Sequence, residues 1–246
     1  MDNGRKFLIF DHYYFCIMAK QKIVVFTGAG ISAESGLQTF RGADGLWEGH
    51  RVEDVATPAA WARNPETVQR FYNIRRKACR EAQPNAGHLA LVELEKYADV
   101  YVITQNIDDL HERAGSKNIL HLHGEIMKAQ SSLDARLVYP LNKDEISMED
   151  KCELGSPLRP HVVWFGEAVP NMVVASRIVQ DADVLLVVGT SLQVYPAANL
   201  LYEVPINCKV ILIDPKASEM RVDSHVELIS GTAAVELPKW INLYAE

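Results

Sequence analysis

The sequence predicts a doubly wound α/β fold, in which helices cover both faces of a parallel sheet and a smaller lobe lies beside it. Short runs rich in β-branched residues alternate with helical patterns, as is typical of such folds. These runs are continuously apolar, which indicates strands buried on both faces. The expected strands are Lys22–Phe26, Val100–Thr104, Asn118–Leu122, Val184–Val188, Val210–Ile213 and Val226–Ile229.

Three helices are expected between the strands, at Pro65–Ala82, Asn85–Tyr97 and Met172–Gln180. The first has apolar and polar side chains at helical spacing on one face. That face is formed by Val68, Phe71, Tyr72, Arg75 and Cys79.

Two segments fit the sheet poorly and are expected to be insertions that form the smaller lobe. Residues 42–84 contain glycine, tryptophan, proline and a helix but no strand pattern, and residues 125–160 are polar and poor in strands. The Rossmann-like core then comprises residues 20–41, 85–124 and 161–246. Residues 1–19 are expected to be an N-terminal extension, with Met18 as a candidate natural start.

Composition excludes several classes of protein. The 246 residues are 48% hydrophobic and 23% charged, which is ordinary for a globular chain and argues against disordered or fibrous structure. The net charge of −7 provides no basic field for nucleic acid or anionic lipid. No apolar run is long enough for a membrane span. We therefore expect no nucleic-acid partner and no association with a membrane.

The cysteines indicate a reducing compartment. All four are far apart, without a C-x-x-C pair, which disfavours a disulfide scaffold. Asp11 and His12 interrupt the apolar stretch Phe7–Met18, which also lacks a cleavage site, so a signal peptide is disfavoured. A cytoplasmic location is expected.

A glycine-rich turn follows the first expected strand, where residues 26–36 read FTGAGISAESG. A glycine turn that opens a helix presents backbone N–H groups to phosphate. Gly28 and Gly30 would let the backbone approach a pyrophosphate, and Ser32 adds a hydroxyl donor. By itself the motif leaves open a tight turn that binds no ligand.

The next segment, QTFRGADGLW at residues 38–47, has the composition of a loop that folds over a ligand. Phe40 and Trp47 would supply an aromatic cover, and Arg41 a cationic anchor. The alternative is an ordinary surface connection with its aromatic residues tucked into the lobe interface.

Polar residues cluster where two further strands end. Gln105, Asn106 and Asp108 follow one strand, at the sheet edge where α/β proteins bind ligands, although helix capping also explains one of them. His121 and His123 follow the next strand and lie on the same face. A histidine there suits general-base catalysis at neutral pH. A structural histidine, or a metal-binding pair that lacks a third ligand, remains an alternative.

Two later strands end in similar signals. Gly189, Thr190 and Ser191 follow one of them, in a composition that suits phosphate or ribose. Asp214 ends the other and places a carboxylate where a ribose hydroxyl could bind. Each alone is also compatible with a simple turn.

Taken in order, the segments GAGISAESG, FRG, TQNID, HLHGE, VVWFGE and GTSLQVYPA resemble the sirtuins, the NAD-dependent protein-lysine deacylases. The resemblance extends from Lys20 to the C-terminus and is strongest to the bacterial class III, desuccinylase-like branch. It implies that NAD and an acylated lysine react to give free lysine, nicotinamide and O-acyl-ADP-ribose.

The resemblance also implies roles for individual residues. His123 matches the catalytic base, which deprotonates a ribose hydroxyl, and Asn106 and Asp108 would position the cofactor for loss of nicotinamide. Asp214 replaces the asparagine common at its position. The implied cofactor contacts are Gly28, Ala29, Gly30, Ser32, Ala33, Glu34, Phe40, Arg41, Trp47, Gln105, Asn106, Ile107, Asp108, Gly189, Thr190, Ser191, Asp214 and Ala233.

The resemblance further implies a substrate class. Tyr72 and Arg75 form the Tyr-x-x-Arg pair that reads the carboxylate of succinyl- or malonyl-lysine in class III members, and Ala56 leaves room for the acyl group. The alternative is a surface arginine among neighbouring cations. The substrate peptide would add as a strand between two edges, residues 192–195 and the segment Val163, Trp164, Phe165 and Gly166.

One departure from the family concerns metal. Most sirtuins hold a structural zinc in the smaller lobe. In this chain Cys152 is the only cysteine in residues 125–160, and together with His161 it cannot complete a set of four ligands. Serines 131 and 132 occupy the region of one ligand position. We therefore expect no zinc and a lobe held by packing alone. The protein is also expected to be a monomer.

Two other classes of function remain as rivals. A nicotinamide dehydrogenase would use the same glycine turn, but no acidic residue closes a second strand about 20 residues further on. A non-catalytic module that binds ADP-ribose or acyl-lysine would not need His123 together with Asn106 and Asp108.

Overall fold

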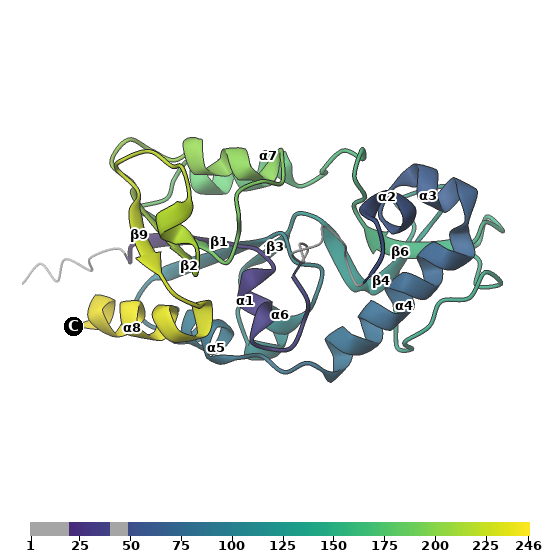
Figure 1. The fold of residues 1–246 in the computed structure, drawn as a ribbon, viewed down its shortest axis with the longest axis horizontal. Helices are drawn as coiled ribbons and strands as arrows, with labels where there is room; N and C mark the ends of the chain where they lie inside the picture. Colours follow the sequence, from purple (N-terminus) through teal and green to yellow (C-terminus); the bar gives the residue numbers. More distant parts are fainter. Residues whose placement is uncertain (1–19, 40–48) are drawn as a thin grey trace, which may run out of the picture.

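The computed structural model describes residues 20–39 and 49–246. Within these residues, six parallel strands form one sheet in the order β3-β2-β1-β7-β8-β9 (Figure 1). The expected strands are confirmed to within one or two residues at each end. They are β1 (Lys22–Thr27), β2 (Asp99–Thr104), β3 (Ile119–His121), β7 (Val184–Val188), β8 (Lys209–Asp214) and β9 (Glu227–Ser230).

Helices cover both faces of this sheet, as the doubly wound class requires. Alternate side chains of β1 enter different cores: Ile23 and Val25 face α5 (Ala86–Leu94) and α8 (Ala233–Ala245), whereas Val24 and Phe26 face α7 (Met172–Val179) and the 3-10 helix η1 (Ala197–Tyr202). Figure 1 shows α7 on one side of the sheet and α5 and α8 on the other. A second 3-10 helix, η2 (Ala217–Glu219), follows β8.

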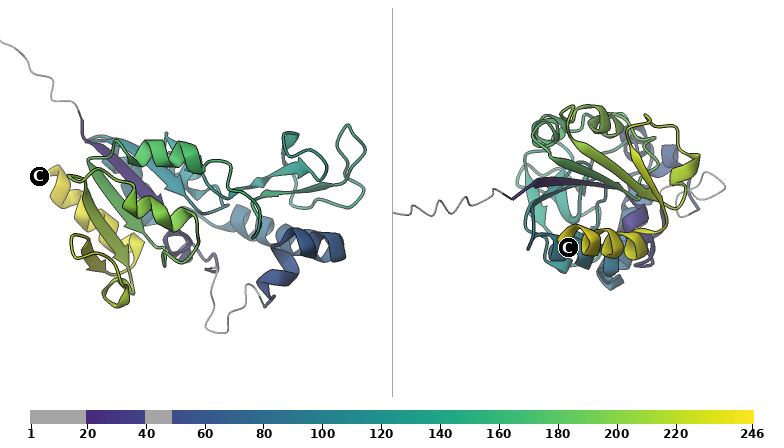
Figure 2. Two further views of the ribbon diagram at one scale, coloured as in Figure 1. Left: turned by 90° about the horizontal axis from the view of Figure 1, so that it is seen from above. Right: turned by 90° about the vertical axis from the view of Figure 1, so that its left-hand side faces the viewer.

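The smaller lobe is built from two insertions that pack on each other, as expected. Figure 2 shows it extending from one end of the sheet. The first insertion contributes α2 (Val52–Val55), α3 (Pro58–Arg63) and α4 (Pro65–Glu81). Asn64 caps α4 by accepting a hydrogen bond from the Thr67 N–H, and Pro65 occupies the first helical turn. The face of α4 predicted from helical spacing is buried in the core of this lobe.

The expectation that residues 125–160 are poor in strands was wrong. Strands β4 (Gly124–Ser131), β5 (Val138–Pro140) and β6 (Leu158–Val162) form a separate antiparallel sheet in the order β5-β4-β6. Its strands carry polar side chains even at buried positions. Gln130, Ser131 and Arg159 are all buried, and each has a side-chain hydrogen-bond partner. The apolar runs that reveal the main sheet are therefore missing from this lobe.

No helix among the described residues is both long enough and apolar enough to span a membrane. The N-terminal stretch Phe7–Met18 and the candidate start at Met18 lie outside the described residues.

Candidate active site

A cavity of about 490 Å³ lies between the carboxyl ends of the parallel strands and the smaller lobe. The sheet contributes the turn after β1 and the segments that follow β2, β3, β7 and β8. The opposite wall is formed by Ala56, which follows α2, by α4 and by the end of β6 with the segment after it. Strands β1 and β7 are the neighbours at which the strand order reverses, and α/β proteins bind ligands at such points. The fold thus brings most of the predicted motifs to one site.

The turn after β1 lies directly against the turn after β7. The Gly28 N–H donates to the Val188 carbonyl at 3.0 Å, and the Gly30 N–H donates to the Gly189 carbonyl at 2.8 Å. A Cβ atom on Gly30 would lie 2.6 Å from the Gly189 Cα, closer than packed atoms approach. Gly189 also has a positive φ of 61°, which glycine adopts readily. The glycines therefore let two loops form one backbone-lined wall of the cavity.

Substitution of Gly30 by alanine is expected to lower the free energy of unfolding by about 1–3 kcal/mol, because backbone on both sides of the contact must move. Chemical denaturation checks this. Gly231→Ala is the matched control: its added Cβ would meet mainly the flexible side chain of Glu236, so a smaller loss is expected. Equal losses for the two variants would contradict the tight-contact explanation.

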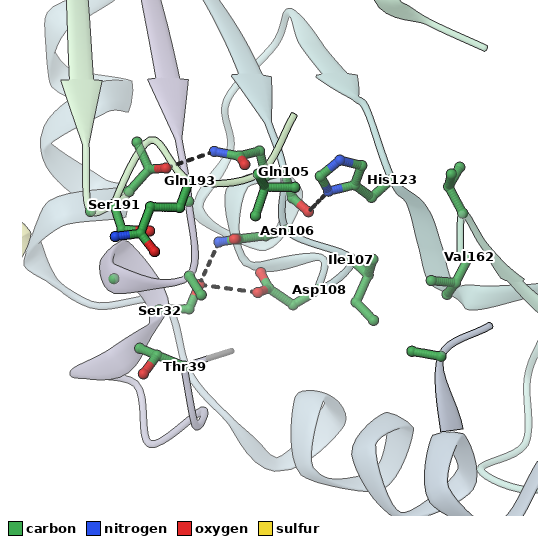
Figure 3. A pocket seen from close by; sticks show the side chains of 18 of the residues that line it. Ser32, Thr39, Gln105, Asn106, Ile107, Asp108, His123, Val162, Ser191 and Gln193 are labelled. Carbon is green, nitrogen blue, oxygen red and sulfur yellow. Dashed lines mark hydrogen bonds between the residues drawn. The ribbon is translucent and has the colours of Figure 1, made fainter. Parts of the chain in front are cut away.

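Ser32, Asn106 and Asp108 form a buried hydrogen-bonded group at the cavity wall (Figure 3). The Asn106 side-chain amide donates to Ser32 Oγ at 3.1 Å, and Ser32 Oγ donates to Asp108 Oδ2 at 3.0 Å. Asp108 Oδ1 accepts from the Leu110 N–H, so this residue also serves the following helix, α6 (Leu110–Ala114). Burial raises the pKa of Asp108. The N-cap of α6 is Asp109, so the sequence-based alternative that Asp108 is a helix cap is not met; Asp108 supports only the turn that leads into α6.

His123 projects into the same cavity, as Figure 3 shows. Its Nδ1 lies 3.0 Å from the Gln105 carbonyl oxygen, which can only accept a hydrogen bond, so Nδ1 carries the proton and Nε2 has a free lone pair. Burial lowers the pKa of His123, which keeps the ring neutral near pH 7. The Gln105 side chain donates to Thr190 Oγ1 at 3.0 Å and joins the segments after β2 and β7. The geometry suits a general base.

The wall formed by the smaller lobe includes Ala56, Tyr72 and Arg75. Tyr72 is fully buried, and burial raises its pKa, so its phenol remains protonated. Arg75 lies one helical turn further along α4 and is buried too. The alternative of a surface arginine is therefore excluded. An acidic group that entered the cavity could meet a phenol donor and a guanidinium together.

A partly buried ion pair holds the segment after β6 in place. Arg159 pairs with both carboxylate oxygens of Glu167 at 2.8 and 2.9 Å, and its guanidinium stacks 3.6 Å from the Trp164 ring centroid. Glu167 Oε2 also accepts from the Trp164 N–H. The Phe165 N–H donates to the Ala56 carbonyl, which ties this edge to α2.

Most predicted site residues line this cavity, although lining alone does not assign their roles. Ala33 and Glu34 are exposed outside it, and Glu34 accepts from the Ala234 N–H, while Ala233, the first residue of α8, is buried in the core. Phe40, Arg41 and Trp47 lie outside the described residues. The predicted residues that line the cavity are Gly28, Ala29, Gly30, Ser32, Ala56, Tyr72, Arg75, Gln105, Asn106, Ile107, Asp108, His123, Val163, Trp164, Phe165, Gly166, Gly189, Thr190, Ser191 and Asp214.

Sequence reasoning missed several lining residues. Leu37 directly follows the glycine motif, Gln38 and Thr39 begin the predicted loop segment 38–47, and Lys216 lies two residues after Asp214, so each lies within or beside a recognised segment. Val162 and Glu167 are the two ends of the segment VVWFGE, and Cys79 lies on the predicted face of α4, but only the packing of the smaller lobe shows that they reach the cavity. Val169 carried no signal of this kind.

No group of three or more potential metal-binding His, Cys, Asp or Glu side chains occurs among the described residues. Cys152 instead lies beside two serines, with its Sγ 3.3 Å from Ser131 Oγ and 3.1 Å from Ser156 Oγ. Hydrogen bonding between Cys152 and these two hydroxyls lowers the pKa of the Cys152 thiol to about 7. The absence of zinc remains a prediction.

Comparison with known proteins places this chain among related sequences and structures. A family model described as "Sir2 family" matches residues 28–196. The chain is 57% identical over 192 residues, 78% of this chain and 92% of the relative, to an NAD-dependent protein deacylase of Aggregatibacter actinomycetemcomitans. It is 50% identical over 213 residues, 87% of this chain and 93% of the relative, to an NAD-dependent protein deacylase of Helicobacter pylori.

Solved structures of Sir2 homologues also resemble this chain. A Sir2 homolog–NAD complex superposes with a TM-score of 0.83 at 40% identity, covering 92% of this chain and 90% of that one. A mutant Sir2 homologue bound to ADP-ribose gives the same TM-score at 39% identity, with 91% of each chain covered. The matched family model spans the glycine turn, the polar group after β2 and His123. The chain therefore belongs to the Sir2 family.

Proposed function

We propose that this protein is an NAD-dependent protein-lysine deacylase. The observation that carries the proposal is the position of His123, whose unprotonated Nε2 shares one cavity with the glycine turn and with the group Ser32, Asn106 and Asp108. A module that only binds ADP-ribose would need the glycine turn and the polar group but not the histidine base.

The residues present suit NAD. At Gly28 and Gly30 there is no room for a side chain, because the loops after β1 and β7 meet there. The wall is therefore lined by backbone, which suits a pyrophosphate. Thr190, Ser191 and Asp214 line the part of the cavity formed by the segments after β7 and β8, where hydroxyl and carboxylate groups suit a ribose. When bound, NAD supplies the ribose carbon with which the acyl oxygen forms a bond as the bond from that carbon to nicotinamide breaks.

The chain then supplies orientation and proton transfer. His123 Nε2 takes the proton of a ribose hydroxyl, because Nδ1–H is already donated to Gln105. Asn106 and Asp108 are fixed by Ser32, so their polar groups are held in place before the cofactor arrives.

We further propose that acidic acyl groups, succinyl and malonyl, are substrates alongside acetyl. Arg75 offers a rigid fork for a carboxylate, and Tyr72 adds a protonated phenol. The small side chain of Ala56 leaves space beside them. These three residues support a place for the protein in the class III branch.

The substrate peptide is proposed to lie as an added strand between residues 163–166 and 192–195. Such pairing uses main-chain hydrogen bonds, so preference for neighbouring sequence should be modest. Phe165 and Tyr195 are exposed at these two edges, with 43% and 69% of their surface accessible, and can contact a peptide.

Mass spectrometry of one peptide carrying acetyl-, succinyl- or malonyl-lysine tests this function, with and without NAD. NAD-dependent loss of each group is expected, with succinyl removed faster than acetyl. Loss of acetyl alone would contradict the acidic-acyl proposal. No NAD-dependent loss of any group would favour a binding module instead.

The pH dependence should report the histidine base. Because burial lowers the pKa of His123, its neutral form persists to below pH 6.5. The deacylation rate is therefore expected to rise through a midpoint below 6.5 on the acidic side and to have levelled off by about pH 7. Initial rates at saturating NAD check this. A midpoint above 7 would contradict the assignment.

A further inference from the structure

A second histidine beside the site has no role in the reaction described above. His121 ends β3, two residues before His123, and is buried outside the cavity lining. The Nδ1 atoms of the two rings contact adjacent backbone carbonyls: His123 that of Gln105 at 3.0 Å, and His121 that of Asn106 at 2.9 Å. The two histidines therefore hold consecutive peptide groups of the segment that carries Asn106 into the cavity.

The other side of the His121 ring faces a carboxylate. Its Nε2 lies 2.8 Å from Glu112 Oε1, on helix α6. A carbonyl oxygen and a carboxylate oxygen both only accept hydrogen bonds, so satisfying both partners requires a proton on each ring nitrogen. His121 is therefore an imidazolium in this arrangement, and Glu112 is its counter-ion.

We propose that His121 is a positioning residue for the cofactor site, kept doubly protonated by Glu112 so that it can hold the Asn106 carbonyl. This proposal rests on the proposed function, because it assigns NAD as the ligand that Asn106 meets. It adds a residue that acts through Asn106 and contacts no substrate itself.

The charged surroundings of His121 come from several elements. Glu125 on β4 favours the imidazolium, and Lys128, also on β4, is paired with Glu125 at 2.7 Å. Asp108 lies close enough for its charge and that of His121 to interact, as do His111 on α6 and His161 on β6. Burial lowers the pKa of His121, but the hydrogen bond and charge of Glu112 outweigh it, so that pKa is raised overall.

The consequence is a loss of affinity at alkaline pH. Above the raised pKa, His121 keeps one proton, which stays on Nε2 because a carboxylate accepts more strongly than a carbonyl. The Nδ1 lone pair then faces the lone pairs of the Asn106 carbonyl, and the hold on Asn106 is lost. NAD affinity should fall about tenfold through this transition, the effect of losing one positioning hydrogen bond to a charged group.

The experiment measures the NAD dissociation constant of the full chain by titration calorimetry from pH 6 to 10. Wild-type protein is expected to show the alkaline loss. Glu112→Gln should abolish it, because the amide can donate to Nε2 and leave the single proton on Nδ1. His121→Asn should abolish it as well, since an asparagine amide can donate from near the Nδ1 position and does not titrate. Circular dichroism confirms folding of each variant.

Glu125→Gln is the matched control, because Glu125 is a neighbouring carboxylate that does not contact the ring, and the alkaline loss should persist there. A flat wild-type profile, or the same alkaline loss in Glu112→Gln and His121→Asn, would overturn the proposal for His121 while NAD binding itself stands. Absence of NAD binding by the wild-type protein at any pH would overturn the proposed function together with this inference.

Discussion

Replacement of His123 by alanine is expected to slow deacylation by about 10²–10⁴-fold, the usual contribution of a general base. NAD binding should survive with a loss of no more than about tenfold, because the glycine turn and the contacts among Ser32, Asn106 and Asp108 remain, while the hold of His123 on the Gln105 carbonyl is lost. Initial rates on an acylated peptide measure the first effect, and calorimetric titration with NAD measures the second.

The exposed His225 provides the matched control, since it lies on the surface outside the cavity lining, and His225→Ala should leave the rate unchanged. Retention of more than a tenth of the wild-type rate by His123→Ala would rule out a base at this position. Loss of NAD binding would mean instead that the imidazole supports the cofactor site.

Replacement of Arg75 by methionine should separate the acyl groups. Removal of succinyl is expected to fall by about 10²-fold, because a buried charge-assisted hydrogen bond to the acyl carboxylate is lost, whereas removal of acetyl should stay the same or rise. The value of kcat/KM for the two peptides, compared within each variant, gives the change in preference directly.

Lys77→Met is the control on the same helix, because Lys77 is exposed and lies outside the cavity lining. It should alter neither activity. An equal loss of both activities in Arg75→Met would indicate damage to the smaller lobe rather than removal of a carboxylate contact, and an unchanged preference would exclude Arg75 from the acyl pocket.

Much of the main sheet could be predicted because its information is local. Strands such as β1 and β7 are buried on both faces, so nearly every side chain in them is apolar and the run is visible in the sequence. The ligand-binding turns follow those strands directly, and parallel strands carry their ends to one edge. The positions of Gly28, Asn106 and His123 near a common site follow from this alone.

The smaller lobe could not be predicted in the same way. Arg159 is buried in β6 because Glu167 and the Trp164 ring accommodate its charge, and neither partner is recognisable from the local pattern. Strand β4 is only partly buried, so its sequence lacks a continuous apolar run. The antiparallel sheet of the smaller lobe was therefore not visible in the sequence, because its buried polar residues have partners that are distant in sequence.

The two histidines of HLHGE show the division most clearly. From the sequence alone it follows that both lie at the end of a strand, that they share a face, and that a histidine there suits a base near neutral pH. The folded structure is needed to show that His123 faces the cavity while His121 contacts Glu112 and the Asn106 carbonyl. Backbone alternation sets the side on which a residue lies, but its protonation and role depend on groups that folding brings to it.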